Sequence, residues 1–110
     1  MVNTYKGSII YNVMYVNLNK YQNRIWELKH KYEGKDCAYD LFDLHFLANE
    51  FKHNVRNGYY GEASLNIFGM GKVCEALHES HTKDSISRKE WLEICEDSLV
   101  SFIRNYMTRS

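Results

Sequence analysis

Pairs of glutamate and histidine three residues apart are the first pattern in this sequence that could do chemistry. The spacing Glu-x-x-His occurs three times: Glu27–His30, Glu50–His53 and Glu75–His78. In carboxylate-bridged di-iron bundles, such pairs project inward from the helices and hold two metal ions. At about 100° per residue, the first two pairs fall opposite the apolar side of their own helices, and of the third only the histidine borders it. The sequence therefore predicts solvated helix faces here.

A separate His-x-x-His pattern, His78 and His81, has acidic neighbours at Glu75, Glu79 and Asp84. Two histidines and a carboxylate can hold a single zinc ion at a protein surface. A polar loop that happens to contain two histidines explains the same residues. We expect no cofactor and no metal site, and His78 and His81 are the candidates if a metal binds.

The stretch "DCAYDLFDLHF", residues 36 to 46, sets acidic and aromatic side chains side by side. On a helix, the aspartates share one flank of the apolar stripe, while the rings lie about 150–210° from that stripe. A helix with two apolar faces has to bury both of them. The candidate partner-binding residues are therefore Asp36, Tyr39, Asp40, Phe42, Asp43 and Phe46.

Composition limits what kind of protein carries these residues. The chain has 110 residues, 45% hydrophobic and 15% aromatic, with a formal net charge of zero, which argues against disorder and against a basic nucleic-acid footprint. No stretch approaches the roughly 20 apolar residues of a membrane span, and we expect neither signal peptide nor membrane association. Three distant cysteines predict a reduced cytoplasmic protein without disulfides.

Four segments show apolar residues three and four apart, the spacing of amphipathic helices. They cover 8–32, 36–56, 62–78 and the residues from 87 onward, and the whole chain contains no proline. Gly34 suits a C-terminal cap of the first helix, and the Asn57–Gly58 pair ends the second. Such short connections favour antiparallel neighbours. We therefore expect a single helical domain over residues 1–110: an all-α, compact bundle of about four mostly antiparallel helices. Gly69 and Gly71 could break the third helix, or let another helix approach it closely.

The fourth helix has the clearest local start signal, "ISRKEW". Ser87 and Glu90 have the spacing of a capping box, and Ile86 and Trp91 that of a hydrophobic staple. The apolar stripe that should follow is Leu92, Cys95, Leu99, Phe102 and Tyr106. All three cysteines fall on predicted core stripes, which indicates small buried side chains without a nucleophilic role.

The second apolar face of the 36–56 helix has a counterpart on the first helix, at Ile9, Val13 and Val16. These faces could meet each other, or the third helix, inside one subunit. They could instead form a homodimer, or a docking surface for a different protein. Aromatic side chains contribute much of the energy of binding, and nearby charges steer the encounter.

We expect a small protein-binding protein with no enzymatic activity, since no nucleophile or phosphate-binding motif is present. Within protein–protein interaction we favour a stoichiometric inhibitor or neutraliser of a basic partner. It would be an immunity protein against a toxin, or a phage-encoded antagonist of a host defence system. One alternative is a helical DNA-binding regulator that uses Arg88, Lys89 and Arg104. A second alternative is a metal-binding helical-bundle enzyme.

Overall fold

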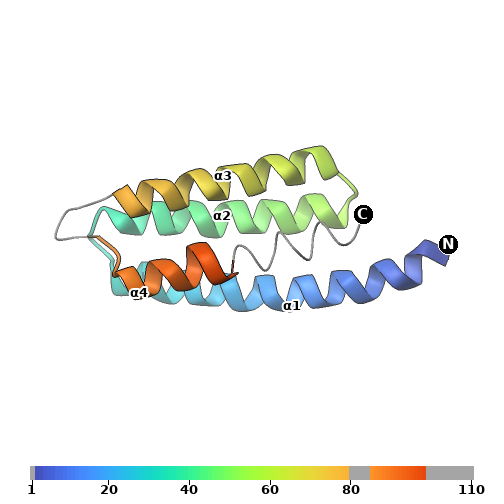
Figure 1. Cartoon of the computed structure of the whole chain (residues 1–110), viewed down its shortest axis with the longest axis horizontal. Coiled ribbons are helices and arrows are strands. Elements are labelled where there is room, and N and C mark those ends of the chain that lie inside the picture. The colour runs from blue at the N-terminus through green and yellow to red at the C-terminus, as the bar shows by residue number, and fades with distance from the viewer. Residues whose placement is uncertain (1, 80–84, 99–110) are drawn as a thin grey trace.

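Three long helices lie side by side in the computed structural model, which describes residues 2–79 and 85–98, with side chains described from residue 17 onward (Figure 1). A short fourth helix continues directly into a π-helix. The bounds are α1 Val2–Lys31, α2 Cys37–Arg56, α3 Tyr60–Glu79, α4 Arg88–Trp91 and the π-helix Leu92–Asp97. Over these residues every element is helical, which confirms the predicted all-α bundle.

Helix α2 packs between α1 and α3, while α4 contacts α3 and the π-helix contacts α1. Side-chain hydrogen bonds join α2 to α1 and α2 to α3. Lys52 of α2 donates to Gln22 of α1 at 3.1 Å, and Asn54 of α2 donates to Asn66 of α3 at 2.7 Å. The fourth segment therefore lies diagonally across the bundle from α2. That position leaves the side of α2 away from the core uncovered by any described element.

Two glycines in left-handed conformations end α1 and α2. Gly34 has φ 86° and Gly58 has φ 77°, values that favour glycine because it carries no Cβ. Gly34 was expected as a C-terminal cap and the Asn57–Gly58 pair as the end of the next helix. Both predictions are confirmed. These tight reversals make α1, α2 and α3 antiparallel neighbours.

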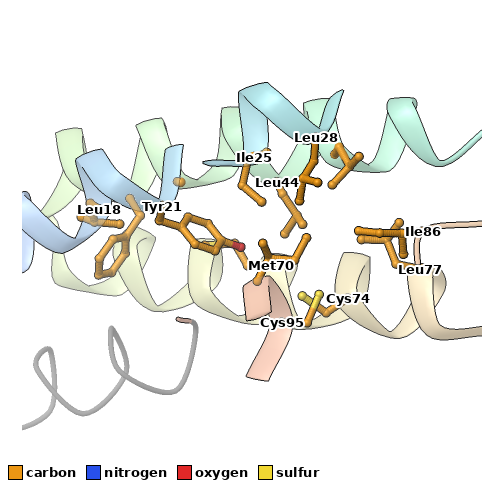
Figure 2. Close-up of a cluster of buried hydrophobic side chains, with 14 of the residues drawn as sticks. Leu18, Tyr21, Ile25, Leu28, Leu44, Met70, Cys74, Leu77, Ile86 and Cys95 are labelled. Atoms are coloured by element: carbon orange, nitrogen blue, oxygen red, sulfur yellow. The ribbon is translucent and has the colours of Figure 1, made fainter. Parts of the chain in front are cut away.

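The predicted apolar stripes of α1, α2 and α3 form the core (Figure 2). Large side chains such as Leu44, Phe51 and Met70 are fully buried. The apolar residues that recur every three or four positions along these helices include the following buried ones: Leu18, Tyr21, Ile25, Leu28, Cys37, Leu41, Leu44, Ala48, Phe51, Val55, Ala63, Met70, Cys74 and Leu77. Tyr32 and Ile67 are partly buried against them. The 3.6-residue period thus identified the buried face of each long helix.

The three cysteines are free and buried, as predicted. Figure 2 shows the sulfur atoms of Cys74 and Cys95 beside each other, at the contact between α3 and the π-helix. A hydrogen bond with Cys74, reinforced by burial, raises the pKa of Cys95. The Cys95 thiol therefore stays protonated, and all three cysteines act as small core side chains.

Helix α3 is continuous through Gly69 and Gly71, so the expected possibility of a break there is wrong. Gly69 lies against Leu47 of α2, where a Cβ would meet both Leu47 methyl carbons at an ordinary 3.4 Å. Open space surrounds Gly71. Packing along α2 offsets the cost of about 1 kcal/mol that each glycine imposes on an isolated helix.

The capping box at Ser87 forms only in part. The N–H of Glu90 donates to Ser87 Oγ at 3.2 Å, as expected. The Glu90 carboxylate does not reach back to the Ser87 amide, which donates instead to the Tyr32 hydroxyl at 3.2 Å. The Glu90 carboxylate accepts hydrogen bonds from Lys31 Nζ at 2.6 Å, from Ser87 Oγ at 2.8 Å and from the Tyr32 hydroxyl. Glu90 therefore ties the end of α1 to the start of α4.

The apolar stripe predicted for the fourth helix is wrong in its first turn. Cys95 is buried as expected, but Ile94 is fully buried and Leu92 is only partly so. The backbone over Leu92–Asp97 is a π-helix, whose wider turn moves each later side chain away from its α-helical position. Leu99, Phe102 and Tyr106 lie outside the described residues.

None of the helices in the described part of the chain is both long and apolar enough to cross a bilayer.

Candidate functional site

Three large aromatic side chains project from the outer side of α2: Tyr39, Phe42 and Phe46, here called the aromatic face. Their exposed fractions are 77%, 46% and 54%, whereas Leu41 and Leu44 on the same helix are fully buried. The diagonal position of α4 explains the contrast, since no described element lies over this side of α2. The alternative that this face is buried inside one subunit is therefore wrong for the described residues.

Carboxylates line one flank of the aromatic face. Asp36, just before α2, and Asp43 are exposed, and Asp40 is partly buried. Within the part of the chain that the structure describes, none of the three forms an ion pair. Partial burial raises the pKa of Asp40, and the negative charges of Asp43 and Asp36 raise it further. A cation brought in by a partner would relieve that repulsion.

Trp26 of α1 extends this surface across to the neighbouring helix, and the sequence reasoning missed it. Its ring is 38% exposed and lies 4.9 Å from the ring of His45, which sits one turn from Phe42 on α2. Lys29 Nζ lies 4.8 Å from the same indole. The sequence did indicate its position: Trp26 directly follows the buried residue Ile25 and therefore lies about 100° around the helix from the apolar stripe of α1.

A second exposed apolar strip runs along α3 and consists of Leu65 and Phe68, which are 69% and 64% exposed. The sequence reasoning did not single it out. Its charges are satisfied on its own helix: Lys72 Nζ lies 5.3 Å from the Phe68 ring and 3.7 Å from a Glu75 oxygen. The α3 strip is therefore also apolar and exposed, but it lacks the flanking aspartates that have no ion-pair partner among the described residues.

The second apolar face expected on the first helix, Ile9, Val13 and Val16, lies on the helical backbone of α1. Its side chains are outside those that the structure describes, so its contacts stay a prediction.

The metal candidates are spread over the described part of the chain. Glu27 and Glu75 are exposed and lie beside a basic residue of their own helix. His30 is exposed, with its ring centroid 5.3 Å from that of Trp26 and its Nδ1 3.7 Å from an oxygen of Glu33, just past the end of α1. His78 stacks on Trp91 with ring centroids 4.7 Å apart, and His81 lies outside the described residues. Among the described residues, no three His, Cys, Asp or Glu side chains gather where they could hold a metal ion.

The basic residues considered for DNA contact lie on a different helix from the aromatic face. Arg88 and Lys89 are exposed at the start of α4, diagonally across the bundle from α2. Arg104 lies outside the described residues.

Comparison with protein-family models, with curated proteins and with solved structures gives no significant match to this chain. Over the residues that the structure describes, the protein is an all-α bundle with an exposed aromatic face, flanked by carboxylates that form no ion pair with any of these residues.

Proposed function

We propose that this chain is a small protein-binding protein that acts through the aromatic face of α2. A single observation carries the proposal: Tyr39, Phe42 and Phe46 stand in one row on one helix and are 46–77% exposed. Contiguous exposed apolar surface on a small protein marks an interaction site. Aromatic rings are the side chains that most often dominate the energy of a protein interface.

The flanking charges indicate the chemistry of the partner. Asp40 and Asp43 lack a cation among the described residues, and partial burial together with the negative charges of Asp43 and Asp36 raises the pKa of Asp40. A basic partner surface would relieve this repulsion and would be drawn in faster by the field. The proposed partner is therefore a protein with a positively charged docking region.

Within this class we favour a stoichiometric inhibitor or neutraliser. A rigid helix that presents rings beside acids suits the masking of a basic active site, because little conformational freedom is lost on binding. An immunity protein against a toxin and a phage-encoded antagonist of a host defence system are the two forms this would take.

The test compares two double variants in the same capture experiment. Immobilised wild-type chain, F42A/F46A and the matched control L65A/F68A are each exposed to a lysate of the native host, and bound proteins are identified by mass spectrometry. The expected partner is held by the wild type and by L65A/F68A but not by F42A/F46A. It should form a 1:1 complex with purified chain and lose its own activity.

Two outcomes would contradict the proposal. One is a partner lost on L65A/F68A and retained on F42A/F46A, which would move the interface to α3. The other is a concentration-dependent dimer in sedimentation that F42A/F46A converts to a monomer. That result would mean that a second copy of the chain covers the aromatic face.

A further inference from the structure

A cavity of about 520 Å³ lies at the junction of α3 and α4, diagonally across the bundle from the aromatic face. Its apolar floor is made by Leu77 and Ile86, both buried and both placed at one end of the core in Figure 2. The volume lies in the range of cavities that bind small molecules. Neither the fold nor the proposed protein interface makes use of this cavity.

One wall of the cavity is aromatic and held in place. The Trp91 indole N–H donates to the backbone oxygen of Cys74 at 2.8 Å, which fixes the orientation of the ring. The His78 ring packs on it at a centroid distance of 4.7 Å and an interplanar angle of 48°. A wall fixed before binding loses little entropy when a ligand arrives. Flat or branched apolar groups fit against such a surface.

The α4–π-helix segment, which carries Trp91, also contributes Arg88, Leu92 and Glu96 to the lining of the cavity. These residues are four apart. Side chains four apart lie on one face of an α-helix. The π-helix over Leu92–Asp97 has slightly more residues per turn, so Leu92 and Glu96 also share one side. π-Helical turns occur frequently at functional sites, and this one shapes the cavity.

Two opposite charges therefore border a cavity that has an apolar floor. Arg88 and Glu96 are both exposed, and neither forms an ion pair among the described residues. A guanidinium favours a carboxylate, which it can bind through two parallel hydrogen bonds. A carboxylate favours an ammonium group. The complementary ligand has one group of each sign beside an apolar or aromatic portion.

We propose that this cavity binds a small apolar zwitterion, of the chemical class of an aromatic or branched amino acid. The carboxylate of the ligand pairs with Arg88, its ammonium group pairs with Glu96, and its side chain lies on Leu77 and Ile86 against the His78–Trp91 wall. This site is independent of the aromatic face, and neither proposal depends on the other.

The test uses the full chain with Trp26→Phe, so that Trp91 is the single fluorophore. Its emission is followed during titration with L-phenylalanine, phenylacetate or phenethylamine, excited where none of the three absorbs. The latter two each lack one charge of the amino acid. We expect L-phenylalanine to bind at least about ten-fold more tightly than either.

Matched variants locate the charges. Arg88→Gln and Glu96→Gln should each weaken L-phenylalanine binding by about ten-fold or more, whereas the neighbouring Lys89→Gln should change it by less than about two-fold. Circular dichroism confirms that each variant stays helical. Equal binding of the three probes, no binding of L-phenylalanine, or equal losses from Lys89→Gln and Arg88→Gln would each overturn the proposal.

Discussion

Carboxylates in two regions of this molecule have pKa values shifted in opposite directions. At the junction of α1 and α4, Glu90 is 7% exposed and accepts hydrogen bonds from Lys31, Tyr32 and Ser87. Burial alone would raise its pKa, but these donors outweigh burial and lower the pKa to about 2. On the outer side of α2, Asp40 has no cation among the described residues, and partial burial, reinforced by the charges of Asp43 and Asp36, raises its pKa.

The difference separates stability from recognition. A charged group that its own chain satisfies holds two helices together and has little left to offer a partner. A charged group left beside like charges contributes little to the fold and gains most when a cation arrives from outside. Changes at Glu90 should therefore alter unfolding, and changes on α2 should alter binding.

The largest expected effect is on binding through the aromatic face. F42A/F46A should weaken the complex with the captured partner by about 100-fold or more, because interface hot spots cost at least about 2 kcal/mol each when truncated. Since both rings are about half exposed in the free chain, unfolding should shift far less than for a core residue. Calorimetric titration measures the loss of partner binding, and urea unfolding measures the loss of stability. Comparable losses of free energy in the two experiments would contradict the separation of recognition from stability.

Next in size is the effect of the buried carboxylate on folding. Glu90→Gln should lower the free energy of unfolding by about 1.5–3 kcal/mol, because hydrogen bonds from a charged group and two hydroxyls are weakened. Glu93→Gln is the matched control. Glu93 pairs with Arg24 at 2.8 Å but is 42% exposed, so its loss should cost at most about 1 kcal/mol. Neither variant should change partner affinity.

The pH dependence of stability should follow Glu90. Its folded pKa of about 2 lies below its ordinary value of 4.5, so the unfolded chain takes up the proton first as the pH falls. The stabilisation is complete above about pH 4.5 and is lost between pH 4.5 and about 2. Urea unfolding at a series of pH values should show this loss in the wild type and a flatter profile in Glu90→Gln. Identical profiles would show that the free energy of unfolding does not depend on protonation of Glu90.

The smallest expected effect belongs to the acids of α2. Asp40→Asn with Asp43→Asn should weaken partner binding by about ten-fold, mostly by lowering the association rate constant. In the wild type, added salt should lower the same rate constant, because it screens the aspartate charges. Wild-type affinity should also fall as the pH drops through the raised pKa of Asp40, because protonation removes the charge that a basic partner meets. Surface plasmon resonance at several salt and pH values measures both. Salt-independent association would contradict a basic partner.

Local patterns predicted most of the fold correctly. The stripe from Cys37 to Val55 and the glycine at the end of α1 depend on residues a few positions apart, where helix periodicity and backbone conformation act directly. Contacts across long separations were not predictable in this way. Glu90 meets Tyr32 from 58 residues away, and no spacing along the chain encodes that contact.

By itself the sequence determined which residues are helical, which face of each long helix is apolar, and that the rings of α2 point away from its core side. The tertiary structure alone decided that nothing described covers those rings. It also placed Trp26 beside His45 and opened a cavity next to Trp91. The reason is physical: periodicity sets the direction of a side chain within its own helix, whereas burial depends on which other helix packs against that side.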